Sequence, residues 1–172
     1  MTRRVVKVGG SLLNWPGLSA ALKRWLAANT GVETWIIAGG GPFANAVRAA
    51  AEIHYLDEES AHWLALRAMG VSTELLADLV GPGEWQFVDP LEFCRADDGR
   101  PGAVPHSWSA TSDSVAARVA ETRAAEIVLL KSASPPPGDA AAWARVGYVD
   151  PHFPAIVSRA HLAVRAINLR EY

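Results

Sequence analysis

Short apolar runs alternate along this chain with longer segments whose apolar residues recur at helical spacing. The clearest runs lie within residues 3–8, 35–38 and 127–130, and each is followed by glycine or lysine. Continuous apolar runs of this length are typical of strands that are buried on both faces. The segment 18–28 between the first two runs has the pattern of an amphipathic helix. Recurrent strand–helix units predict an α/β fold, a three-layer α/β/α sandwich with a mostly parallel central sheet.

The same patterns predict the remaining elements, all within a single domain that spans residues 1–172. Further helices are expected at 42–53, 57–69, 72–79 and 115–124, and further strands at 86–88 and 162–167. Residues 97–101 have the composition of an exposed loop, and the three prolines of 134–138 predict a stiff surface connection. A short helix is expected before the last strand.

Composition and charge limit the kinds of binding partner that the protein is expected to have. Half of the 172 residues are hydrophobic, a fifth are charged and the net charge is −2, so no broad basic surface for nucleic acid is expected. No stretch approaches the ~20 apolar residues of a membrane-spanning helix. The single Cys94 cannot form an internal disulfide, which favours a reducing, cytoplasmic setting. We therefore expect a cytoplasmic protein that binds neither nucleic acid nor membrane.

Polar and glycine-rich segments follow three of the predicted strands. These segments are Lys7–Ser11, Gly39–Gly41 and Lys131–Ser132. Because ligands of open parallel sheets bind beyond the carboxyl ends of the strands, we expect the three segments to meet at one edge. Asp113 begins the helix that precedes the last of these strands. Two lysines, two glycine turns and a carboxylate are what phosphoryl transfer requires, namely charge neutralisation, main-chain donors and an orienting acid.

Three ordered motifs resemble those of the amino acid kinase family, which includes acetylglutamate and uridylate kinases. They are VVKVGGSLL at 5–13, IIAGGGPFANAVR at 36–48 and TSDSVAARVAETRAAEIVLLKS at 111–132. The resemblance implies an α/β/α fold, ATP and Mg²⁺ as cofactors, a small-molecule phosphate or carboxylate acceptor, and a homo-oligomer. No metal-binding residue is expected, because magnesium on ATP phosphates keeps mainly water ligands.

The same resemblance assigns roles to individual residues. The implied catalytic residues are Lys7, Asp113 and Lys131. The implied nucleotide site consists of Lys7, Gly9, Gly10, Ser11, Lys131, Ser132, Tyr148 and Asp150. The implied acceptor site consists of Gly39, Gly40, Gly41 and Ser112.

The chain departs from the family toward its C-terminal end. The VDGVY-D-x-DP stretch typical of the family is reduced to residues 146–151, behind the proline-rich loop, so the nucleotide-binding part is shortened. The adenine and ribose are expected near residues 132–150. In length and layout the chain most resembles the small aminomethylfuran phosphate kinases of methanofuran biosynthesis, a branch of one-carbon metabolism. That resemblance implies aminomethylfuran methyl phosphate as the acceptor. Its amine would call for a carboxylate, from Asp57, Glu58 or Glu59, and an aromatic wall, from Trp63 or Trp108.

Other interpretations remain open at this point. The acceptor could instead be isopentenyl phosphate, a nucleoside monophosphate or an amino-acid carboxylate, or the protein could bind its ligand without catalysis. Asp113 could serve only as a helix cap, and Lys131 could be a solvated residue at a strand end. The chain has neither a P-loop motif nor the GxGxxG dinucleotide fingerprint, and its five histidines lack the spacing of a metal cluster.

Overall fold

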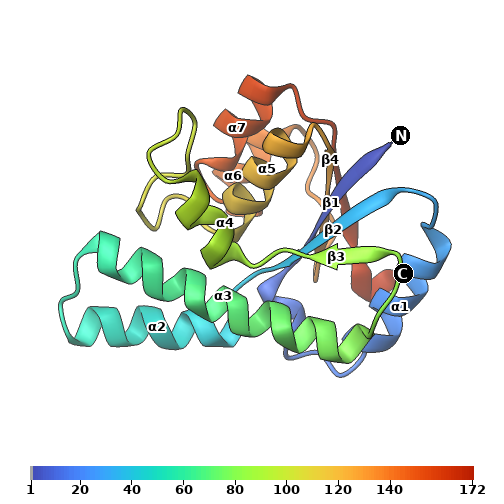
Figure 1. Ribbon diagram of the computed structural model, residues 1–172, viewed down its shortest axis with the longest axis horizontal. Coiled ribbons are helices and arrows are strands. Elements are labelled where there is room, and N and C mark those ends of the chain that lie inside the picture. The colour runs from blue at the N-terminus through green and yellow to red at the C-terminus, as the bar shows by residue number, and fades with distance from the viewer. Residues whose placement is uncertain (1) are drawn as a thin grey trace.

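A computed structural model describes residues 2–172 as a single five-stranded sheet with helices on both faces (Figure 1). The strands are β1 (Arg3–Val8), β2 (Glu33–Ala38), β3 (Trp85–Phe87), β4 (Glu126–Lys131) and β5 (Val164–Asn168). Their order across the sheet is β3-β2-β1-β4-β5, and every neighbouring pair is parallel. The predicted α/β/α class is confirmed, and the sheet is parallel throughout.

Within the described residues 2–172, seven α-helices connect and cover these strands. They are α1 (Leu18–Ala28), α2 (Gly41–Ile53), α3 (Glu58–Val80), α4 (Pro90–Asp97), α5 (Ser112–Arg123), α6 (Ala140–Arg145) and α7 (Phe153–Ala160). One face of the sheet packs against α5, α7 and the first half of α3, and the other packs against α1 and the end of α3. The helices α2 and α3 pack side by side as a hairpin that extends beyond the sheet (Figure 1). Within residues 2–172, no helix combines the length and the apolar character that crossing a bilayer requires.

Side-chain alternation in the two central strands decides where the polar residues point. Val5 of β1 and Leu129 of β4 belong to the core beneath α5. Lys7 and Lys131 each follow one of them by two positions, so they lie on the same face of the sheet. In the strand register Lys7 pairs with Leu129, which makes the two lysines diagonal neighbours. Both ammonium groups are thereby directed toward the N-terminus of α5.

The predicted division of α3 into two helices, 57–69 and 72–79, is wrong. The helix runs without interruption from Glu58 to Val80. Two polar residues at the expected break bond within the helix. The hydroxyl of Ser72 donates to the Ala68 carbonyl, and that of Thr73 donates to the Met69 carbonyl. Helices α4 and α6 were not predicted.

Asp150 ties the loop before α7 to the start of α5. Its buried carboxylate accepts six hydrogen bonds, from the main-chain and hydroxyl groups of Thr111 and Ser114 and from the main-chain N–H groups of His152 and Phe153. The N-cap residue Thr111 makes no side-chain capping bond, and the start of α5 is capped instead by this carboxylate, which lies 39 residues further along the chain.

Substitution of Asp150 by alanine is expected to lower the free energy of unfolding by about 2–4 kcal/mol, because several buried donors lose their acceptor together. Asp150→Asn should retain part of the stability that Asp150→Ala loses, since one acceptor oxygen remains. Urea denaturation of both variants checks this, with exposed Asp78→Ala as the control. A loss no larger than that of the control would show that the six bonds contribute little.

Candidate active site

Two lysines and one aspartate form a buried ion-pair network at the carboxyl edge of the sheet. The Lys7 ammonium lies 2.8 Å from Oδ1 of Asp113, and the Lys131 ammonium lies 3.0 Å from Oδ2. Lys7 is 4% and Asp113 5% exposed. Asp113 stands in the first turn of α5, so the helix dipole adds to the two positive charges that favour its carboxylate. The structure thus brings the three predicted catalytic residues into direct contact.

The network keeps Asp113 charged and lowers the pKa of Lys131. Burial acts to raise the pKa of Asp113, but the two ammonium groups outweigh it and hold that pKa below its ordinary value. Burial and the neighbouring charge of Lys7 lower the pKa of Lys131 to about 8, although Asp113 opposes the shift. The Lys131 ammonium group therefore begins to lose its proton in mildly alkaline solution.

Tyr148 holds Lys131 from the other side. The ammonium group donates to the Tyr148 carbonyl oxygen and lies 4.9 Å from the centre of the Tyr148 ring. The phenol in turn donates to the carbonyl of Ala133 at 3.2 Å. Burial and then the charge of Asp113 raise the pKa of Tyr148 to about 12, so it remains a neutral donor. In this structure the predicted nucleotide-site residue Tyr148 positions a lysine.

For the phosphoryl transfer that the sequence predicts, kcat/KM is expected to fall about tenfold per pH unit above pH 8. The reason is that Lys131, with its lowered pKa, loses the positive charge that would stabilise phosphate oxygens. Lys131→Arg should keep measurable activity and lose this alkaline limb, because guanidinium stays protonated. A pH profile of both proteins checks the assignment, and an unchanged alkaline limb in the arginine variant would assign it to another group.

The two predicted glycine turns touch each other beside this network. The Gly9 N–H donates to the Leu130 carbonyl and the Gly39 N–H to the Val8 carbonyl, both at 2.8 Å. A Cβ on Gly10 would lie only 2.3 Å from the Gly41 nitrogen, and one on Gly39 would lie 2.6 Å from the Gly10 nitrogen. Gly41 also has a φ of +51°. This packing admits only glycine at these three positions. The first turn also lies against β4, since a Cβ on Gly9 would stand 3.6 Å from the Cα of Lys131.

Ser11 and Ser132 join the first turn to the end of β4. Their hydroxyl oxygens are 2.8 Å apart. Two of the predicted nucleotide-site residues are therefore adjacent. The carboxylate of Asp150, by contrast, is occupied by the hydrogen bonds described above, and its contact with a nucleotide stays a prediction.

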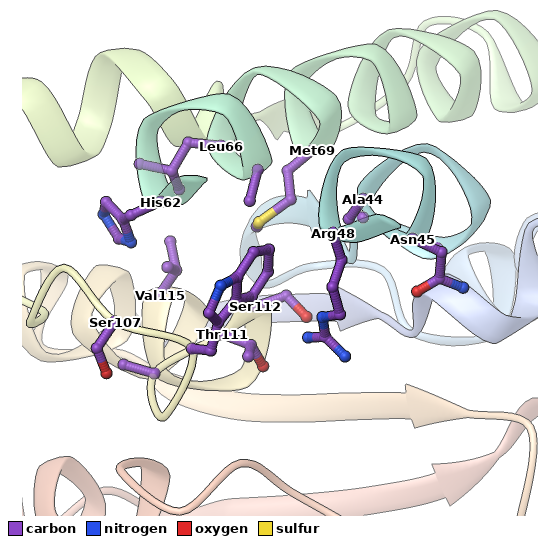
Figure 2. Close-up of a pocket in the computed structure, with 15 residues that line it drawn as sticks. Ala44, Asn45, Arg48, His62, Leu66, Met69, Ser107, Thr111, Ser112 and Val115 are labelled. Carbon is purple, nitrogen blue, oxygen red and sulfur yellow. The ribbon is translucent and has the colours of Figure 1, made fainter. Parts of the chain in front are cut away.

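A cavity of about 170 Å³ opens between α2, α3 and the start of α5 (Figure 2). It is lined by Gly40, Gly41, Ala44, Asn45, Arg48, His62, Ala65, Leu66, Met69, Ser107, Trp108, Ala110, Thr111, Ser112 and Val115. Three of the predicted acceptor residues, Gly40, Gly41 and Ser112, line it, and Gly39 packs directly behind them. The N-termini of α2 and α5 both lie along this wall, where the positive ends of the two helix dipoles favour an anion.

Arg48 and His62 line the cavity, but the sequence motifs did not identify either of them as a site residue. Arg48 lies on the same face of α2 as Gly41 and Ala44, and its guanidinium is 4.5 Å from the centre of the Trp108 ring. His62 shares helical spacing with the lining residues Leu66 and Met69. Apolar spacing on a helix, interrupted by one polar residue, was the available signal for both.

The carboxylates expected to meet an acceptor amine, Asp57, Glu58 and Glu59, are not among the cavity's lining residues, and that interpretation is wrong for this cavity. Asp57 caps α3 by accepting from the Ser60 N–H at 2.7 Å. Of the two candidate aromatic walls, Trp108 lines the cavity and Trp63 does not. Across residues 2–172, no group of three or more His, Cys, Asp or Glu side chains is arranged to hold a metal.

Comparison with known proteins establishes the fold. No family model matches the chain, and no curated protein matches its sequence. Among solved structures, the uridylate kinase from Archaeoglobus fulgidus is similar, with a TM-score of 0.65 at 16% identity, covering 96% of this chain and 90% of that one. The UMP kinase from Bacillus anthracis is similar at a TM-score of 0.65 and 13% identity, covering 98% of this chain and 88% of that one. At sequence identities this low, the similarity shows a shared fold and nothing more.

Proposed function

We propose that the protein is an ATP-dependent small-molecule kinase that transfers the γ-phosphoryl group to a compact phosphate monoester. The observation that carries the proposal is the Lys7–Asp113–Lys131 network, set between two touching glycine turns and an adjoining cavity. Preorganised positive charge of this kind is the main requirement of phosphoryl transfer. The likeness to uridylate kinase structures supports the proposal.

In the proposed reaction an acceptor phosphate oxygen attacks the γ-phosphorus of ATP. The bond between that phosphorus and the β,γ-bridging oxygen breaks, and its electron pair leaves with ADP. Lys7 would contact the transferring group, Lys131 would stabilise the charge on the departing phosphate, and Asp113 would hold both lysines. An ionised acceptor has no proton to remove, so the reaction requires no general base. Magnesium on the nucleotide would supply further charge neutralisation.

The nucleotide is proposed to lie over the first glycine turn and the end of β4. Main-chain groups of Gly9 and Gly10 and the paired hydroxyls of Ser11 and Ser132 would bind its phosphates. The adenosine would extend toward Tyr148, in the shortened C-terminal part of the single domain.

The size and lining of the cavity favour a compact acceptor. An engineered apolar cavity of about 150 Å³ accommodates benzene, so about 170 Å³ accommodates one substituted ring and is small for a nucleoside monophosphate. The Trp108 ring offers a flat wall for such a ring. We therefore propose aminomethylfuran methyl phosphate, the acceptor of methanofuran biosynthesis, with isopentenyl phosphate, UMP and amino-acid carboxylates as alternatives.

The test is ADP release from ATP and Mg²⁺ with a panel of these four acceptor types. Turnover with the furan phosphate, and less than about one per cent of that rate with UMP, is the expected result. Turnover with UMP alone would contradict the compact acceptor and retain the kinase. If ATP raises the melting temperature but no acceptor gives ADP, the second candidate, a non-catalytic ligand-binding protein, is favoured.

Self-association is proposed as well. Ile53, Tyr55 and Leu56, around the turn between α2 and α3, are 69%, 94% and 41% exposed. Apolar side chains gathered in this way are common at subunit interfaces. Analytical ultracentrifugation of the protein and of Tyr55→Ser tests for a homo-oligomer that involves this turn.

A further inference from the structure

His62 is a polar side chain held in a mainly apolar part of the cavity. It is 7% exposed and lines the cavity together with Leu66, Met69 and Val115. Among the side-chain hydrogen bonds of residues 2–172, none involves His62. Burial and then the neighbouring His106 lower the pKa of His62 to about 4, so the ring is neutral near pH 7, with one N–H donor and one nitrogen acceptor.

Aromatic neighbours fix the orientation of this ring. His106 stacks on it with ring centres 4.7 Å apart, and Trp63 meets it edge-on at 5.3 Å. His106 is itself held between Asp98, 3.3 Å from its Nε2, and Glu59, 3.7 Å from its Nδ1. The ring of His62 therefore has little freedom to turn away from the cavity and find another partner.

His62 lies at the end of the cavity opposite to Arg48, the side chain that can bind an anion. Figure 2 shows His62 at one end of the cavity and Arg48 and Asn45 at the other. Arg48 is the one side chain with a permanent charge among the residues that line the cavity. An acceptor whose anionic group lies toward Arg48 and the glycine turn would place the far end of its body against His62.

We propose that His62 determines acceptor specificity by forming a hydrogen bond with a polar group on the acceptor, at the end remote from its phosphate. This inference rests on the proposed function, because it takes the cavity as the acceptor site. An acceptor with an amine or hydroxyl at that position satisfies the buried imidazole. A hydrocarbon tail, such as that of isopentenyl phosphate, covers the imidazole and leaves it unpaired, which disfavours binding. The substrate class is therefore a compact phosphate monoester with a second hydrogen-bonding group.

Three furan-3-ylmethyl phosphates that differ only in one ring substituent, aminomethyl, hydroxymethyl or methyl, test this proposal. Dissociation constants follow from quenching of tryptophan fluorescence, and kcat/KM from ADP release. The protein is expected to bind the aminomethyl or hydroxymethyl compound about 10- to 100-fold more tightly than the methyl compound. The more tightly bound of the two polar compounds identifies the group.

Variants of His62 separate recognition from packing. His62→Phe keeps a ring in the aromatic cluster and should reduce the preference to less than about twofold, whereas His62→Gln should retain part of it through its amide. The exposed His54→Gln is the matched control and should leave the preference unchanged. Circular dichroism establishes that each variant is folded.

The outcomes discriminate between the two proposals. Equal affinities for the three compounds, no binding of any of them, or a preference that survives in folded His62→Phe would overturn the role of His62. A His62-dependent preference in binding without any ADP formation would uphold that role and contradict the proposed kinase activity.

Discussion

Replacement of Lys7 by alanine is expected to lower kcat about 10³-fold. Lys7 is the buried lysine of the central strand, and its ammonium lies 2.8 Å from Asp113. Removal of one preorganised positive group from a phosphoryl-transfer site has an effect of about this size. The fold should survive, because Lys131 continues to pair with Asp113 at 3.0 Å. Initial rates of ADP release, measured at saturating ATP and acceptor, check the prediction.

The matched control for this variant is Lys23→Ala, since Lys23 is exposed on α1. Its kcat should remain within about twofold of the unchanged protein, because isolated surface substitutions have small effects. If Lys7→Ala, shown to be folded by circular dichroism, retained full activity, the network would have a structural role only.

Replacement of Asp113 by alanine is expected to abolish activity and to lower the free energy of unfolding by about 3–5 kcal/mol. The change leaves the buried ammonium of Lys7 without its counter-charge and beside Lys131. Asp113→Asn should be less destabilising because it preserves the shape of the side chain, and it should still lose most of the activity. Urea unfolding and ADP release together measure both effects, with exposed Asp78→Ala as the control.

The pH dependence of stability offers an independent check on Asp113. Its pKa is lower in the folded chain than its ordinary value of 3.8, so the folded state binds this proton less tightly than the unfolded state. The stabilisation it provides is present above pH 3.8 and is lost as the pH falls through the lowered pKa. Asp113→Asn should remove this component of acid denaturation. An identical acid limb in the asparagine variant would contradict the ion-pair account.

The strands and the glycine turns could be predicted because local sequence determines them. Val5 and Leu129 lie in short apolar runs that are typical of buried strands, and the period of two then places Lys7 and Lys131 on one face. The contact between the glycine turns followed from the rule that parallel strands end at a common edge. These features required no knowledge of distant contacts.

The cavity could not be predicted in the same way, because it is made by elements that meet only in the folded chain. Trp108 reaches Arg48 from a loop 60 residues away, and His62 enters from a third segment. The cap of α5 similarly comes from Asp150, which the family resemblance assigned to the nucleotide site. The continuity of α3 depended on Ser72 and Thr73 bonding within the helix, a choice that helix propensity alone does not decide.

The central claim is that this site transfers a phosphoryl group from ATP to a compact phosphate monoester. Phosphorus-31 NMR of the protein with ATP, Mg²⁺ and aminomethylfuran methyl phosphate tests it most directly, because the spectrum reports both products. The expected result is the loss of the acceptor monoester signal and the growth of a diphosphate signal together with ADP, with neither change in Lys7→Ala. A spectrum in which ATP and every acceptor of the panel persist unchanged, while ATP still stabilises the fold, would contradict the claim.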